Sequence, residues 1–327
     1  MLATSTRADI AEEARRKLGG GQTRTQTSRP CNTAAMDDAF GRKGRALVLG
    51  GGGVAGIAWE IGLLARLAER DLDLAAGADL VVGTSAGATV GALVTGPDTY
   101  ETMVSFQRRP VTETKEQVPA LDTDEMAEIF GLMVSEDADR QAVRRRIGSL
   151  AKSAATVPEA ERRRIIASRL PVDAWPDRPL VVTAVDADSG DRVAFDRSSG
   201  ASLVDAVAAS CAVPGIWPPV TIGSRRYVDG GVYSVANEDL ADGYRTVVAL
   251  FPIAIGEEAS LADPEGLARM TGRLCVVADA HAQAAFGPNV LDPASRAASL
   301  DAGMEQADRV IDAVRDWWEG DASSGRH

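Results

Sequence analysis

Short apolar runs alternate with amphipathic segments through the middle of this chain. Ala46–Leu49 is a continuous apolar run of the kind that forms a buried parallel strand, and Asp79–Val82 ends in a second one. Strand, helix and strand in this order form a βαβ unit, so the pattern predicts a mainly parallel sheet with helices on both faces. The helix between the two strands is indicated by apolar side chains at helical spacing, at Ile57, Ile61, Leu64 and Leu67.

The same alternation returns in the second half of the chain. Leu180–Val185 and Arg192–Phe195 flank a polar turn and predict a hairpin. Further strands are predicted at Thr246–Phe251 and Arg273–Val277, and further helices at Ala280–Phe286 and Asp301–Glu319.

The pattern also sets the expected domain organisation. At 327 residues and 45% hydrophobic, the chain can bury a full core, and we expect one α/β domain over residues 45–320. Residues 1–44 are largely polar with mixed charges, which predicts a flexible N-terminal extension, and 321–327 predict a disordered tail. Residues 46–64 are apolar apart from Glu60, as in a membrane-spanning helix. Six glycines within that stretch favour a strand, a turn and a helix instead.

Residues 106–172 interrupt the alternation and predict a helical cap inserted into the domain. The first half of this insert is acidic and the second half is basic. Over 144–164, seven positive charges against Glu159 and Glu161 leave a net +5. Two interpretations stay open: the opposite charges pair across the surface, or the basic face makes transient contact with phospholipid headgroups.

Charge and cysteine content restrict the partners and the compartment. The net charge of −12 argues against a nucleic-acid-binding protein and gives no long-range attraction to anionic membranes. Three cysteines are too few for a disulfide framework, which indicates a reducing compartment. No apolar signal region is visible at the N-terminus. We therefore expect a cytoplasmic protein that can also sit peripherally at a membrane.

Candidate chemistry begins at Gly83-Thr84-Ser85-Ala86-Gly87, directly after the second predicted strand. This is the G-x-S-x-G pattern of a nucleophile elbow, in which a serine sits on a sharp turn between a strand and a helix. Glycine at both ends lets neighbouring backbone approach the turn. The N-terminus of the following helix directs partial positive charge toward an anion formed near Ser85. The alternative is a tight turn of small residues without catalytic function.

A second glycine-rich turn follows the first predicted strand. Gly51-x-Gly53-x-x-Gly56 presents backbone N–H groups to an anion, as an oxyanion loop does. The same spacing fits a dinucleotide-binding fingerprint, which would make the chain a non-catalytic ligand-binding protein. That fingerprint needs an acidic residue at the tip of the second strand, where this chain has the turn that carries Ser85. The spacing therefore favours the oxyanion loop.

A serine nucleophile needs a base, and only His281 and His327 offer an imidazole. A triad of Ser85, Asp229 and His281 has the chain order of α/β-hydrolases, yet His281 lies in the first turn of a predicted helix. Asp229 ends a predicted strand and precedes two glycines. As a direct base it needs a raised pKa, which a partly apolar pocket can supply. An Asp-Gly hairpin turn is the structural alternative.

Together these motifs resemble the patatin-like phospholipase family, in its bacterial-type serine acyl hydrolase form. Gly51–Gly56 is similar to its glycine-rich oxyanion loop, Gly83–Gly87 to its nucleophile motif, and Asp229–Gly231 to its Asp-Gly-Gly/Ala motif. Residues 209–220 are similar to the stretch before that aspartate, and the resemblance extends over residues 46–235. It implies a three-layer α/β/α sandwich around a mainly parallel sheet. It also implies hydrolysis of lipid or fatty-acyl esters by a Ser–Asp dyad, without histidine, metal or cofactor.

Carried over residue by residue, the resemblance makes Ser85 the nucleophile and Asp229 its base and later proton donor. The oxyanion hole falls on Gly51, Gly52, Gly53 and Val54, and the supporting glycines are Gly56, Gly83, Gly87, Gly230 and Gly231. One departure is Ala55, where the family usually has Arg or Lys. That change removes a positive charge near the loop and leaves open how a phosphate-bearing substrate is held.

Overall fold

The computed structural model describes residues 44–119, 128–129, 131–133, 135 and 139–320. All of them belong to one compact unit, Phe40–His327. The predicted extension over 1–44, apart from Gly44, and the predicted tail over 321–327 lie outside the described residues, as does much of the acidic half of the insert.

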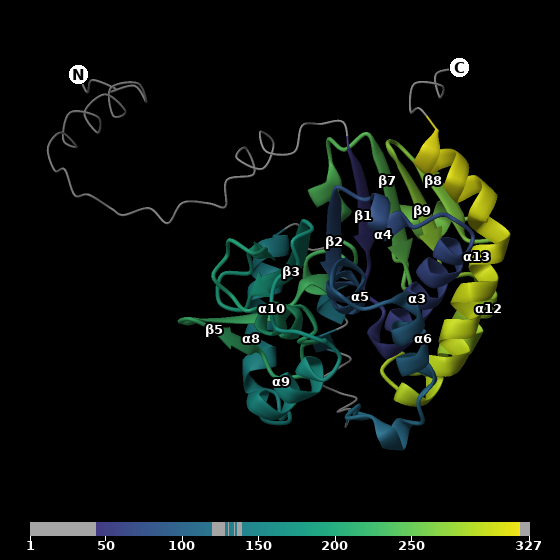
Figure 1. The fold of residues 1–327 in the computed structure, drawn as a ribbon. Coiled ribbons are helices and arrows are strands. Elements are labelled where there is room, and N and C mark those ends of the chain that lie inside the picture. The colour runs from purple at the N-terminus through teal and green to yellow at the C-terminus, as the bar shows by residue number, and fades with distance from the viewer. Residues whose placement is uncertain (1–43, 120–127, 130, 134, 136–138, 321–327) are drawn as a thin grey trace, which may run out of the picture. The chain divides into compact units, whose positions relative to one another are not determined.

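Within the described residues, nine strands form one mixed sheet (Figure 1). Its central strands are parallel, and they follow the predicted apolar runs. In spatial order these strands are β3 (Leu180–Asp186), β2 (Leu80–Thr84), β1 (Arg45–Leu49), β7 (Thr246–Phe251) and β9 (Arg273–Val277). Nearly all of their side chains are buried, as expected for parallel strands that lie between two layers.

Antiparallel strands extend this sheet on both sides. β4 (Arg192–Phe195) completes the predicted hairpin with β3, and β8 (Leu267–Met270) pairs with β9. β6 (Arg225–Asp229) pairs with β3 and with β5 (Val220–Ile222). The sheet is therefore parallel at its centre and antiparallel at its margins.

The register along β3 brings two chain segments together. β4 occupies one edge of β3, where it pairs with residues 182–185. Both β2 and β6 therefore pair with the other edge of β3, β2 with residues 180–183 and β6 with residues 184–186. β2 ends with Thr84 opposite Thr183, and β6 ends with Asp229 opposite Ala184. Adjacent residues of a strand are about 3.3 Å apart, so the last residues of β2 and β6 are neighbours in space.

Four helices cover one face of the sheet: α3 (Gly53–Glu69), α5 (Ala86–Thr95), α10 (Leu203–Ser210) and α13 (Arg296–Glu319). Their apolar residues share one core with alternate strand positions such as Leu47, Leu49 and Val248. Figure 1 shows α13 running beside α3, with α6 (Tyr100–Arg108) and α12 (Ala280–Phe286) in the same group.

The closing helix α13 begins at Arg296, five residues before its predicted start at Asp301. The charged Arg296 is buried there, and its guanidinium donates hydrogen bonds to the backbone oxygens of Pro293, Phe106 and Arg109. A buried arginine satisfied by backbone carbonyls does not fit an apolar helical pattern, which is why the pattern missed the first turn.

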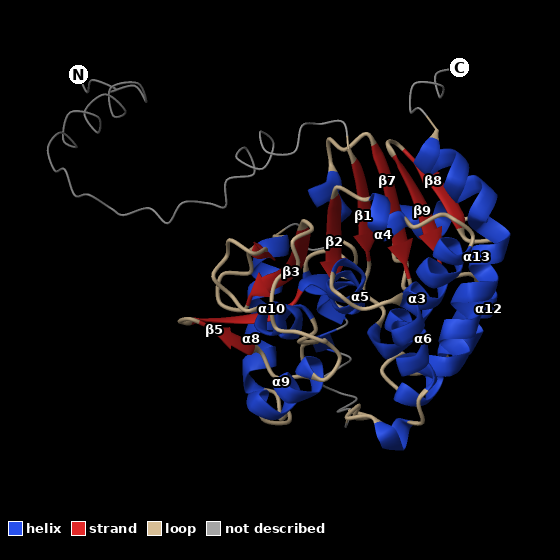
Figure 2. Cartoon of the chain, in the orientation of Figure 1, coloured by secondary structure: helices blue, strands red, loops and turns tan. Residues whose placement is uncertain are grey.

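The opposite face is covered at its β3 end by α8 (Arg140–Ser153). Val143 and Ile147 of α8 pack with Val185 and Val228, which point away from the helix-covered face. α9 (Glu159–Ala167) packs near α10, and Figure 2 shows α8, α9 and α10 gathered around β3 and β5. The remaining short helices are α4 (Leu74–Gly77), α11 (Glu257–Leu261), η1 (Val111–Glu113), η2 (Gly230–Val232), η3 (Glu238–Ala241) and η4 (Pro293–Ser295).

The apolar stretch 46–64 divides into β1, a glycine turn and the first turns of α3, as the glycines predicted. Throughout the described part of the chain, no helix combines the length and the apolar character needed to cross a membrane. Helices flank both faces of a sheet whose central strands are parallel, so the predicted α/β/α class is confirmed.

Candidate active site

Ser85 sits at the sharp turn between β2 and α5. Its backbone has φ +55° and ψ −112°, a left-handed conformation that non-glycine residues adopt at a cost. Two hydrogen bonds hold this turn: the Ser85 N–H donates to Ser210 Oγ at 2.8 Å, and the Cys211 thiol donates to the Ser85 carbonyl at 3.1 Å. The serine is 8% exposed. A strained serine at a sharp strand-to-helix turn is the backbone geometry expected of a nucleophile elbow.

Gly87 lets the start of α5 approach β1. A Cβ at this position would overlap the backbone carbonyl of Leu49. The Gly87 N–H donates to the Gly50 carbonyl at 2.9 Å, which ties the helix to the glycine loop. Ser85 and the glycine loop are therefore held against one another by backbone contacts that a side chain would prevent.

The glycine loop presents open backbone N–H groups at the start of α3. Gly51 is not one of them, because its N–H donates to the Val235 carbonyl at 2.8 Å. The N–H groups of Gly52, Gly53 and Val54 have no hydrogen-bond partner among the described residues. Gly53 has φ +62°, which turns the chain from the loop into the helix and favours glycine. Three consecutive free donors at a helix N-terminus suit an anion.

Asp229 is buried at the end of β6 and 5% exposed. Its Oδ1 accepts a hydrogen bond from the Gly231 N–H at 2.8 Å, whereas Oδ2 has no hydrogen-bond partner of regular geometry among the described residues. Burial raises the pKa of Asp229 from 3.8 to about 7, although the Gly231 N–H and the Ser85 side chain partly oppose this rise. Asp229 thus combines an open acceptor oxygen with a pKa near neutrality.

Asn237 connects the elements that carry Ser85 and Asp229. It is fully buried, and its Nδ2 lies within hydrogen-bond distance of Thr84 Oγ1 (3.1 Å), Thr183 Oγ1 (3.2 Å) and the Gly230 carbonyl (3.3 Å). Thr84 precedes Ser85, and Gly230 follows Asp229. Sequence reasoning missed this residue, because nothing local distinguishes an asparagine in a polar loop from one that joins two strands to the turn after a third.

The pocket around Ser85 has apolar walls and contains two arginines. Its apolar lining comes from Val54, Ile57, Val213, Trp217 and Leu291, together with Ala86 and Cys211. Arg162 and Arg169, both on or just after α9, complete the lining.

Arg162 was counted in the basic half of the insert, Arg169 lies just beyond the counted range, and neither was singled out as a site residue. A local signal exists: Arg162, Ile165, Ile166 and Arg169 follow i, i+3, i+4 and i+7 spacing, so both arginines share a face with two buried isoleucines. Three other basic residues of the insert pair with carboxylates. Arg146 pairs with Glu128, while Lys152 and Arg163 pair with acids outside the insert.

His281 lies elsewhere. It occupies the first turn of α12, is 59% exposed and pairs with Glu305 at 3.1 Å. It does not line the Ser85 pocket. The structure therefore brings Ser85 and Asp229 together and leaves His281 at the surface. Over the described residues there is no group of three or more His, Cys, Asp or Glu that could hold a metal ion.

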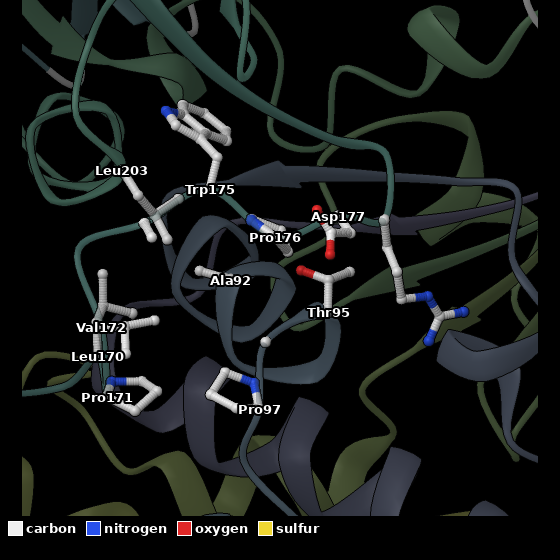
Figure 3. Close-up of a pocket in the computed structure, with 13 residues that line it drawn as sticks. Ala92, Thr95, Pro97, Leu170, Pro171, Val172, Trp175, Pro176, Asp177 and Leu203 are labelled. Atoms are coloured by element: carbon white, nitrogen blue, oxygen red, sulfur yellow. The ribbon is translucent and has the colours of Figure 1, made fainter.

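A larger pocket lies at the other end of α5. Figure 3 shows it between Ala92 and Thr95 of α5, Leu203 and the segment 170–178. Ser85 precedes this ten-residue helix, which is about 15 Å long at 1.5 Å per residue. The two pockets share no lining residue. The larger pocket is thus separate from the candidate site.

Comparison with known proteins identifies one family, and solved structures with a similar fold include the two described below. A family model described as Patatin-like phospholipase matches residues 47–242. No curated protein sequence matches the chain. Among solved structures, VipD from Legionella pneumophila is similar at 13% identity and TM-score 0.42, over 83% of this chain and 67% of that one. The type III effector protein ExoU is similar at 16% identity and TM-score 0.34, over 83% of this chain and 54%, about half, of that one.

Proposed function

This chain belongs to the patatin-like phospholipase family, and from that premise we propose that it is a serine hydrolase of lipid acyl esters that works through a dyad of Ser85 and Asp229. The family match covers more than half of the chain and includes both residues. The family supports the reaction class, and the local geometry supports the choice of residues.

In the proposed reaction, the Ser85 hydroxyl attacks the ester carbonyl carbon while Asp229 Oδ2 accepts its proton. The tetrahedral intermediate then collapses, and the leaving alcohol takes that proton from Asp229. Water next attacks the acyl-serine, Asp229 again accepts and returns a proton, and the fatty acid leaves. A carboxylate is a competent base for this role because its pKa is raised to about 7 by burial.

The negative charge of the tetrahedral intermediate needs hydrogen-bond donors that are fixed in advance. We assign this role to the N–H groups of Gly52, Gly53 and Val54, since Gly51 already donates to Val235. The Ala86 N–H, also without a partner among the described residues, is a further candidate because the residue after an elbow nucleophile commonly contributes. Losing one donor of this kind typically costs about 3 to 4 kcal/mol in the transition state.

One observation carries the proposal: Asp229 is buried with an unpartnered Oδ2 at the strand end adjacent to the strained Ser85 turn. An unpaired buried carboxylate oxygen costs stability, so a purely structural role is a poor explanation. The side chains around Ser85 are mainly apolar, which suits the acyl carbons next to the ester carbonyl. Contact of the cap with a membrane surface stays a prediction.

The test combines active-site labelling with turnover. A fluorophosphonate probe should label the wild type and not Ser85→Ala. Asp229→Asn should lose hydrolysis of p-nitrophenyl esters by about three orders of magnitude or more, as expected when a general base is removed. His281→Ala should retain wild-type turnover. If Ser85→Ala labels equally, the serine mechanism is wrong, and if His281→Ala alone is inactive, the triad replaces the dyad.

A further inference from the structure

The Ser85 pocket contains a buried positive charge that the reaction above does not use. Arg162 is 5% exposed, and its Nε and Nη1 have no hydrogen-bond partner among the described residues. A buried guanidinium normally pairs with a carboxylate or donates to backbone oxygens, because leaving it unpaired is expensive. Arg296, also buried, does so with three carbonyl groups.

The neighbouring charges do not neutralise Arg162. Glu116 is the carboxylate that acts electrostatically on Arg162, and it is engaged by Arg169 through two hydrogen bonds of 2.7 and 2.8 Å. Arg162, Arg169 and Glu116 together therefore carry one excess positive charge. Burial and the like charge of Arg169 lower the pKa of Arg162, which is the expected response of a cation without a counter-ion.

Arg162 is nevertheless held in one orientation. Its guanidinium carbon lies 3.7 Å from the ring centroid of Trp217, so the planar group stacks on the indole face. Stacking fixes the plane and leaves the N–H groups at its edge free to donate in that plane. Arg162, Trp217 and Ser85 all line the same pocket. The glycine loop at this pocket, residues 50–57, contains no basic residue.

We propose that Arg162 is the binding residue for an anionic, phosphate-type group of the substrate, held beside the ester that Ser85 attacks. The inference rests on the proposed hydrolase function and names the residue that would hold the phosphate of a phosphate-bearing acyl ester. A fork of guanidinium donors matches phosphate oxygens in geometry and charge. The phosphate supplies the counter-ion that Arg162 lacks in the folded protein. Binding therefore removes the unfavourable free energy of an unpaired buried guanidinium.

The main experiment compares two substrates that differ only in charge: a 1-acylglycerol and the corresponding 1-acylglycerol 3-phosphate. The quantity measured is the ratio of kcat/KM for the phosphate ester to kcat/KM for the neutral ester. Arg162→Gln should lower this ratio by about 10- to 100-fold, the size expected for charge-assisted hydrogen bonds. The matched control is Arg164→Gln, which removes the same charge from an exposed position on the same helix and should leave the ratio unchanged.

The thermal unfolding midpoint serves as the control that each variant is folded. Because Arg162→Gln removes an unpaired buried charge, its midpoint should equal or exceed that of the wild type. A ratio in Arg162→Gln within fivefold of the wild-type ratio overturns the proposal. So does an equal loss on both esters, since it would mean that Arg162 acts on the oxyanion common to both reactions.

A second measurement separates this proposal from the proposed function and tests free phosphate as an alternative ligand. Inorganic phosphate is added at constant ionic strength, with chloride as the reference, and the thermal midpoint is followed. If the wild type hydrolyses neither ester, the proposed function fails. In that case a phosphate-induced rise in the thermal midpoint that depends on Arg162 still supports an anion site at Arg162. The absence of such a rise overturns the anion site as well. If phosphate stabilises the protein through Arg162 but the substrate ratio is unchanged, the site takes free anions and the substrate assignment is wrong.

Discussion

The raised pKa of Asp229 predicts that the proposed base destabilises the protein at neutral and alkaline pH. The folded protein binds a proton at this carboxyl with a pKa of about 7, whereas the unfolded chain has the ordinary value of 3.8. The folded state therefore holds the proton more tightly, and the free energy of unfolding falls as pH rises from about 4 to about 7. Asp229→Asn keeps the shape and removes the ionisation, so it should escape this loss.

The magnitude follows from the two pKa values. Each pKa unit corresponds to about 1.36 kcal/mol, so the full cost of ionising Asp229 in the folded state is about 4 kcal/mol above pH 7. At pH 5 the unfolded carboxyl is already ionised while the folded one is protonated, and about 2 kcal/mol of that cost is present. Between pH 5 and pH 8, the wild type should therefore lose about 2 to 3 kcal/mol relative to Asp229→Asn.

The assay is urea unfolding at pH 5 and pH 8, followed by fluorescence of the five tryptophans. Taking the difference between the two pH values cancels any pH-independent effect of the substitution, such as altered hydrogen bonding to Gly231. Asp312→Asn, at an exposed position on α13, is the matched control and should show a difference below about 0.5 kcal/mol. A stability advantage of Asp229→Asn that is constant with pH, or larger at pH 5, would refute the reasoning.

Three further predictions test the site more widely. Asp229 must be ionised to accept a proton, so log kcat/KM should rise with unit slope up to about pH 7 and then level off. A pH profile that is flat from pH 5 would contradict the role of Asp229 as the base. Asn237→Ala removes the amide donor shared by two threonine hydroxyls and two backbone carbonyls, so the free energy of unfolding should fall by about 1 to 3 kcal/mol, measured by denaturation. In steady-state kinetics, kcat should fall more than KM changes. Gly87→Ala places a methyl group on the Leu49 backbone and should lower the thermal midpoint or prevent folding, whereas Gly131→Ala, with open space around the added methyl, should not.

The sequence alone determined the elements whose formation depends on nearby residues. The apolar runs at 46–49, 246–251 and 273–277 predicted strands because a parallel strand buried on both faces requires continuous apolar side chains. The turn around Ser85 was predictable for the same reason: its conformation depends on small residues at fixed neighbouring positions. β8, with the sequence LARM, was not predicted, since four residues are too few to show an alternating pattern.

The tertiary structure decided which of these elements meet and what charge states result. Asn237 is 153 residues from Thr84, and Arg162 is 55 residues from Trp217, so neither contact leaves a periodic signal in the sequence. The pKa of Asp229 depends on how completely the surrounding elements exclude water, which no motif specifies. Local patterns encode backbone conformation, because that depends on neighbouring residues. Proximity and desolvation arise from the register along β3 and the packing of α9, and these exist only once the whole sheet has formed.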